Sequence, residues 1–162
     1  MEQIDALHAD VQRRLFRDTF QQSEIPHLLL DPRKGLHIVD LNAAYGAATL
    51  TSCGKVAGRA MFEVFPDNPS DEGADGVNNL YASLKRAAEI GLPDVMPTQR
   101  YDVRDATGMF LTKFWKPTNT PIFDPQGRLV YLLHEVKDVT NSAFRKPPLA
   151  ETDRNHRTPL AH

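Results

Sequence analysis

The chain has 162 residues, 41% hydrophobic and 25% charged, which is ordinary for a globular protein and sufficient for one domain with its own core. Its formal net charge of −2 comes without a stripe of Lys and Arg, so we expect no direct binding of nucleic acid or of an anionic membrane surface. The single cysteine, Cys53, excludes an internal disulfide and a CxxC zinc site.

The beginning of the chain is polar and amphipathic, unlike the apolar centre of a signal peptide. No apolar run approaches the ~18 residues of a transmembrane helix. We therefore expect a cytoplasmic protein.

Residues 2–22 contain no Pro or Gly and carry apolar side chains at helical spacing, so they predict an amphipathic helix that ends before Pro26. Two roles stay open for the apolar stripe: docking on the helix's own domain, or pairing with a second subunit. We treat residues 1–23 as a segment apart from the main domain, residues 24–140. The candidate dimer interface comprises Ile4, Leu7, Val11 and Leu15.

Two short strands are predicted at residues 27–30 and 36–40, joined by a turn that contains Pro and Gly. Asn42 is a good N-cap for a short helix that follows. The strongest helical pattern runs from Asp75 to Ile90, and Gly91 ends it.

Three strand candidates follow at residues 95–104, 109–123 and 128–139, connected by tight turns at 105–108 and 124–127. The last two strands are apolar on both alternating faces, whereas an antiparallel sheet usually leaves one face in water. We expect one face to border a cavity and the other to meet a helix or a partner. The element order predicts an α+β fold, an antiparallel sheet with helices over one face.

The segment of residues 141–162 combines prolines and charges with few apolar residues, so we predict a disordered tail.

Several local motifs occur in a characteristic order. They are residues 26–31 (PHLLLD), residues 38–45 (IVDLNAAY), Gly58-Arg59 with Phe62 and Phe65-Pro66, residues 119–124 (NTPIFD) with Gly127, and Asp138-Val139-Thr140. Together they resemble the PAS sensory domain family of bacterial signalling proteins over about residues 16–140.

The resemblance implies a five-stranded antiparallel sheet with helices over its inner face, an N-terminal flanking helix, and space for a small molecule between sheet and helices. It implies a sensor or regulatory domain that binds a small molecule or dimerises, and that relays the change to an effector. Asp138 and Thr140 are the candidate output point. The implied partners are a second copy of the chain and a downstream kinase, cyclase or transcription regulator, as in two-component signalling.

The ligand itself stays unknown. A flavin that bonds covalently to cysteine would need a thiol just after Gly58-Arg59, and haem would need an axial histidine on the long helix; the sequence has neither. A flavin held without a covalent bond, or another small organic ligand, remains open. For Trp115, packing beneath the N-terminal helix and a place in the pocket wall both stay open. The pocket candidates are Tyr81, Leu84, Tyr101, Trp115, Asn119 and His134.

Two alternatives to a sensor remain. One is a ligand-free interaction module with a filled core. The other is an isomerase-like enzyme, for which Arg100, Tyr101, Asp102 and His134 are the nearest candidates. No pair of carboxylates and no Ser/His pair has motif spacing, so we expect no catalysis, and no cluster has metal-ligand spacing.

Overall fold

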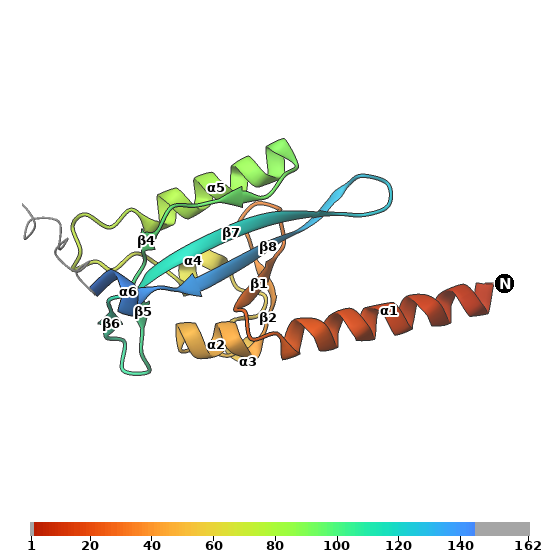
Figure 1. Cartoon of the computed structure of the whole chain (residues 1–162), viewed down its shortest axis with the longest axis horizontal. Helices are drawn as coiled ribbons and strands as arrows, with labels where there is room; N and C mark the ends of the chain where they lie inside the picture. The colour runs from red at the N-terminus through yellow and green to blue at the C-terminus, as the bar shows by residue number, and fades with distance from the viewer. Residues whose placement is uncertain (1, 145–162) are drawn as a thin grey trace, which may run out of the picture.

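The computed structural model describes residues 2–144 as a six-stranded antiparallel sheet with helices packed on its inner face, and a separate two-stranded sheet formed by residues 103–104 and 110–111 (Figure 1). The strand order is β2-β1-β8-β7-β3, and β4 also pairs with β7, so that β3 and β4 share one edge. The predicted α+β fold is therefore confirmed. The elements are α1 Glu2–Gln22, β1 His27–Leu30, β2 Ile38–Leu41, α2 Ala43–Thr49, α3 Cys53–Val56, α4 Met61–Val64, α5 Gly76–Ile90, β3 Asp94–Val95, β4 Gln99–Arg100, β5 Val103–Arg104, β6 Phe110–Leu111, β7 Phe114–Phe123, β8 Leu129–Asp138 and α6 Thr140–Phe144.

The centre of the sheet is the long hairpin of β7 and β8, which pair from Trp115↔Asp138 to Phe123↔Leu129. The turn closes through hydrogen bonds between Asp124 and Arg128, and Gly127 adopts a φ of 79° that favours glycine. Buried and more exposed residues alternate along both strands. The two broad faces of the hairpin are thus distinct: one lies in the core and one faces outward.

The predicted strand at residues 95–104 is wrong as a single element, because the chain there forms three two-residue strands, β3, β4 and β5. The cause is proline. The N–H and C=O groups of the odd-numbered residues of β7 point toward this edge of the sheet. This follows from the pairing of Trp115 with Gln99 and of Asn119 with Asp94. Pro97 lies in the gap between β3 and β4, and Pro117 and Pro121 of β7 have no N–H to donate to this edge, so the edge strand is interrupted there.

Helix α5 begins one residue after Asp75, but the Asp75 side chain makes no capping hydrogen bond. Instead the Asp67 carboxylate, from the preceding loop, accepts a hydrogen bond from the Val77 N–H (3.1 Å). Gly91 ends the helix in a left-handed conformation, as its position predicts. Helix α5 lies over the inner face of β7 and β8 and forms the roof of the core (Figure 1).

Helix α1 extends away from the sheet and touches the rest of the chain near its C-terminal end (Figure 1). Phe20 is buried, and the Gln21 amide donates to the Asp40 carboxylate (3.4 Å). Further toward the N-terminus, Val11 and Leu15 are 45% and 60% exposed. The other two interface candidates are Ile4 and Leu7, and their side chains are outside the described part of the structure. Only the last turns of α1 therefore pack against the chain's own domain.

The end of the described chain differs from the prediction. Residues 141–144, assigned to the disordered tail, belong to α6, and residues 145–162 lie outside the described part. Among residues 2–144, no helix combines the length and apolar character needed to cross a lipid bilayer.

Asn42 joins α1, β1 and α2 as well as capping α2 as predicted. Its Oδ1 accepts from the N–H groups of Tyr45 (2.9 Å) and His27 (3.0 Å). Its Nδ2 donates to the carbonyls of Phe20 (3.0 Å) and Ile25 (2.8 Å). The side chain is fully buried, so each lost bond would leave a buried backbone group without a partner.

We expect Asn42→Ala to lower the free energy of unfolding by about 3 kcal/mol, because it removes a cap and exposes these unpaired groups to an apolar interior. Urea denaturation followed by circular dichroism measures the change. Asn78→Ala, at an exposed position of α5, is the matched control and should stay within about 0.5 kcal/mol of the parent. Equal loss in both variants would contradict the assigned role.

Candidate functional site

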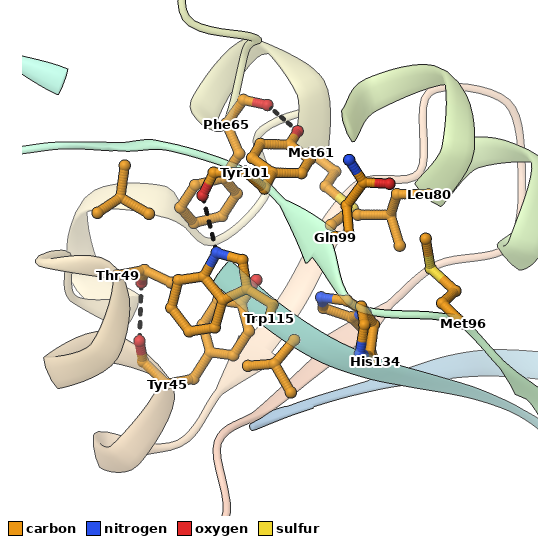
Figure 2. A pocket seen from close by; sticks show the side chains of 13 residues that line it. Tyr45, Thr49, Met61, Phe65, Leu80, Met96, Gln99, Tyr101, Trp115 and His134 are labelled. Atoms are coloured by element: carbon orange, nitrogen blue, oxygen red, sulfur yellow. Dashed lines mark hydrogen bonds between the residues drawn. The ribbon is translucent and has the colours of Figure 1, made fainter. Parts of the chain in front are cut away.

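An apolar cavity lies between the inner face of the β7–β8 hairpin and the helices that cover it (Figure 2). Its free volume is about 40 Å³. None of the lining side chains carries a formal charge at neutral pH, since the one histidine among them is held neutral by burial. The lining residues are Tyr45, Thr49, Met61, Phe65, Leu80, Met96, Gln99, Tyr101, Val103, Trp115, Pro117, His134 and Val136.

Aromatic side chains fix one wall of the cavity. The Trp115 Nε1–H donates to the Tyr101 carbonyl (2.7 Å), and the Tyr101 hydroxyl donates to the Phe65 carbonyl (Figure 2). Burial raises the pKa of Tyr101 and keeps its hydroxyl protonated. Trp115 therefore lies in the cavity wall, and its alternative placement beneath the N-terminal helix is wrong.

His134 lines the cavity from the same inner face of the hairpin as Trp115, and it belongs to a buried series of hydrogen bonds that reaches the surface. Its Nδ1 lies 2.7 Å from Oδ1 of Asn119, and Nδ2 of Asn119 donates to Oγ of Ser83 (2.8 Å). Ser83 in turn donates to Oδ2 of Asp94 (2.5 Å), which Arg86 also contacts (3.1 Å). The series links β8, β7, α5 and β3.

The direction of this series fixes the tautomer of His134. The pKa of Asp94 is lowered by the hydrogen bonds from Arg86 and Ser83, so its carboxylate can only accept. Ser83 must then donate to Asp94 and accept from the Asn119 amide, which leaves Oδ1 of Asn119 to accept from His134. Nδ1 of His134 therefore carries the proton, and in the neutral ring Nε2 is a hydrogen-bond acceptor.

The six pocket candidates take four different positions. Tyr101, Trp115 and His134 line the cavity, whereas Asn119 lies behind His134 and orients it. Leu84 packs in the core but is not among the lining residues. Tyr81 is 52% exposed on the outer side of α5, with its ring edge-to-face with Phe62.

Sequence reasoning did not find Tyr45, Gln99, Met61 and Met96. Tyr45 follows the cap Asn42 by three residues, so it lies one turn inside α2, and this spacing is the signal that could have located it. The other three follow turns or lie on two-residue strands, where no periodicity marks which side faces the core.

In this structure the cavity is much smaller than the pockets that hold cofactors. Pockets for ligands of drug or cofactor size usually have about 300–1,000 Å³, many times the free volume of about 40 Å³ found in this chain. Cys53 is not among the lining residues; its thiol donates to Asp40 (3.3 Å), and partial burial together with Asp40 raises its pKa. In the described part of the chain, no three His, Cys, Asp or Glu side chains cluster to hold a metal ion.

Asp102 and Arg100, two of the candidates for catalysis, are engaged with each other. The Arg100 Nη2 donates to Asp102 (3.0 Å), which also accepts from Asn68 (2.9 Å) and from the Lys113 N–H (3.2 Å). Burial alone would raise the pKa of Asp102, but these hydrogen bonds outweigh it and hold the pKa below its usual value. Neither residue lines the cavity, so Asp102 is poorly suited to accept a proton from a bound substrate.

The exit from β8 forms a clamp on the start of β7. Thr140 donates to the Asp138 carboxylate through its N–H (2.9 Å) and its hydroxyl (2.5 Å). The Phe114 N–H donates to Oγ1 of Thr140 (3.1 Å), and Lys113 pairs with Asp138 (3.0 Å). Asp138 and Thr140 thus hold the first turn of α6 against β7.

The buried His134 predicts a specific loss of stability in acid. Burial, with a smaller effect of His27, lowers its pKa from 6.5 to about 3, so protons bind the unfolded chain first. Above about pH 6.5 this group should not affect the free energy of unfolding. As the pH drops below that value, the free energy of unfolding should decrease by up to about 1.4 kcal/mol per pH unit.

Urea midpoints measured between about pH 6.5 and pH 4.5, above the range where the carboxylates titrate, test this. His134→Gln should flatten the slope, whereas His8→Gln, at an exposed position of α1, should leave it unchanged. A slope that persists in His134→Gln would contradict the neutral, buried state of His134.

No family model matches the sequence, and no curated protein matches it either. Several solved structures, however, have a similar fold. An RNA-binding Light-Oxygen-Voltage receptor matches with a TM-score of 0.63 at 15% identity, over 83% of this chain and 34% of the receptor, so this chain spans about a third of that protein. The PAS domain of a protein from Colwellia psychrerythraea matches with a TM-score of 0.58 at 16% identity, over 79% of this chain and 97% of that one. A Light-Oxygen-Voltage domain whose mechanism was probed with a flavin analogue matches with a TM-score of 0.57 at 17% identity, over 78% and 85%. The chain has the PAS fold.

Proposed function

We propose that this chain is a sensory signalling domain that binds a small molecule in its cavity and relays the occupied state through the exit of β8. The observation that carries the proposal is the register of the central hairpin. Trp115, in the cavity wall, is the direct ladder partner of Asp138, in the exit clamp. A ligand that moves Trp115 acts on the clamp across one pair of residues.

The clamp is suited to report such a movement because it is small and directional. It consists of hydrogen bonds among Phe114, Asp138 and Thr140, together with the Lys113–Asp138 ion pair. A ligand can shift the clamp only by binding its closed and open states unequally. The effector that would read this change is a kinase, a cyclase or a transcription regulator in the cytoplasm.

Hydrogen exchange at the exit tests the relay. A small molecule that raises the melting temperature of the parent should also change the protection of the Thr140 and Val139 amides. Thr140→Val removes the hydroxyl that joins Phe114 to Asp138, so it should keep binding but lose this change. Thr112→Val, at an exposed position before β7, is the control.

If a metabolite library produces no stabilising compound, the sensor function fails. If binding leaves the exit amides unaffected in the parent protein, the relay fails.

A second function is favoured by the small cavity: a dimerisation module whose core is filled by its own side chains. Three apolar residues of α1, Val11, Leu15 and Phe16, are about half exposed. On the outward face of the sheet, Val95 is 74% exposed, and Tyr131 borders a hollow together with the C-terminal half of α1. A second copy of the chain would cover these side chains.

We expect Leu15→Lys to convert dimers into monomers, because it places a charge in the apolar stripe of α1 without touching the core. Light scattering across a concentration series measures the mass. Ile90→Lys, which is similarly exposed at the end of α5, should leave the mass unchanged. A Leu15→Lys protein that remains dimeric would remove α1 from the interface.

A further inference from the structure

The cavity contains two polar atoms with no hydrogen-bond partner within residues 2–144, and both keep some accessible surface, because no fully buried side-chain N or O atom in this part of the chain lacks a partner. One is Nε2 of His134, whose Nδ1 is already bonded to Asn119. The other is the hydroxyl of Tyr45, whose pKa burial raises. The two residues are 3% and 4% exposed, and their rings meet edge-to-face with centroids 5.9 Å apart. In Figure 2 one nitrogen of His134 faces the cavity, and the Tyr45 ring extends beneath Trp115 toward it.

Every other polar side chain in the lining is already engaged. Gln99 accepts from Asn79 (2.8 Å) and donates to Asp75 (2.8 Å) and to the Arg100 carbonyl (2.9 Å). Thr49 donates to the Tyr45 carbonyl (2.7 Å). The hydroxyl of Tyr101 and the indole N–H of Trp115 bond to main-chain carbonyls. Polar recognition is therefore concentrated at His134 and Tyr45.

The charge of the wall restricts what these two groups can bind. Because His134 is neutral and no Lys or Arg lines the cavity, a carboxylate would enter without a counter-charge. Arg100, the sequence candidate for pairing with a carboxylate, is instead paired with Asp102 and Asp71. An anionic ligand is thereby disfavoured.

Size sets the remaining limit. A volume of about 40 Å³ exceeds the ~10–15 Å³ that one water requires, but it is smaller than the ~150 Å³ engineered cavity that binds benzene. Met61 and Met96 form part of the wall, and unbranched thioether side chains repack more readily than branched ones. The cavity is therefore smaller than a benzene site, and a compact five-membered ring enters only if Met61 or Met96 repacks.

We propose that the cavity recognises a compact, uncharged molecule that donates one hydrogen bond to Nε2 of His134 and accepts one from the Tyr45 hydroxyl. This assignment rests on the proposed sensory function and names the chemical class of its ligand. Neutral heteroaromatic N–H compounds and small alcohols belong to this class. Carboxylates and pure hydrocarbons do not.

Three compact probe molecules separate the effect of a donor N–H from the effect of a negative charge. Pyrazole has a donor N–H next to an acceptor nitrogen, isoxazole replaces that N–H by oxygen in a ring of the same shape, and propionate carries a negative charge. Affinity is measured by titration of the full-length chain under nuclear magnetic resonance, with the imidazole ¹⁵N signals of His134 as the local readout. Pyrazole should bind roughly tenfold more tightly than isoxazole, and it should shift the Nε2 signal.

Tyr45→Phe keeps the ring and removes the hydroxyl, so it should weaken pyrazole binding roughly fivefold. Tyr81→Phe, which removes an exposed hydroxyl from α5, should have no effect. Because Tyr45→Phe retains the packing of the ring, its melting temperature without ligand shows whether a loss of binding reflects misfolding. Asn119→Asp is a second variant, because an added carboxylate beside Nδ1 should broaden or shift the His134 signals.

Several results would overturn the assignment. These are isoxazole binding as tightly as pyrazole, propionate binding more tightly than either, or pyrazole leaving the Nε2 signal unchanged because water alone occupies the site. If library compounds still bind and move the exit amides in such a case, the sensory function stands and only the ligand class is wrong.

Discussion

The rest of the site depends on a one-way chain of hydrogen bonds from Asp94 through Ser83 and Asn119 to His134. Each member can satisfy its neighbour in one orientation only, because the carboxylate at the outer end accepts and never donates. The buried imidazole is kept neutral by its burial, and the chain of hydrogen bonds that starts at the Asp94 carboxylate, next to Arg86, holds it in one tautomer. Such a network is costly if one member is missing, since the low dielectric that strengthens it also penalises an unpaired group.

This series of hydrogen bonds also connects secondary-structure elements that have few other contacts with one another. Strand β3 has two residues and is cut short by the prolines of β7, so its ladder contributes little. Asp94 lies on this strand, and its bonds to Ser83 and Arg86 attach the strand to α5. The same carboxylate thus holds the sheet edge, holds the roof of the cavity and sets the polarity of the cavity wall. A change in any one of these contacts alters the other two.

The parts of the fold that rest on local chemistry could be read from the sequence. The β7–β8 hairpin follows from two apolar runs around Asp124–Gly127, and Asn42 and Gly91 mark helix ends because caps need particular side chains or a left-handed residue. The break in the edge strand had a signal in the sequence, because Pro97 lies between β3 and β4, but the effect of Pro117 on this edge depends on pairing with a distant strand. Tyr81 shows the limit for the site. Periodicity places it on a helix, but only the packing of α5 decides that its ring turns outward.

The small volume and the two unpaired polar atoms describe one physical condition. Nε2 of His134 and the Tyr45 hydroxyl have no protein partner but remain accessible from the cavity, whereas a core that filled this space would have to desolvate both at a cost in free energy. A molecule that bonded to both would gain two hydrogen bonds, and its binding energy would be added to the stability of the folded chain. Because Trp115 lines the cavity and pairs with Asp138, such binding would act one residue pair away from the exit clamp. A module meant only for dimerisation needs no polar pair that faces a cavity, and this is the physical ground for proposing the sensor first.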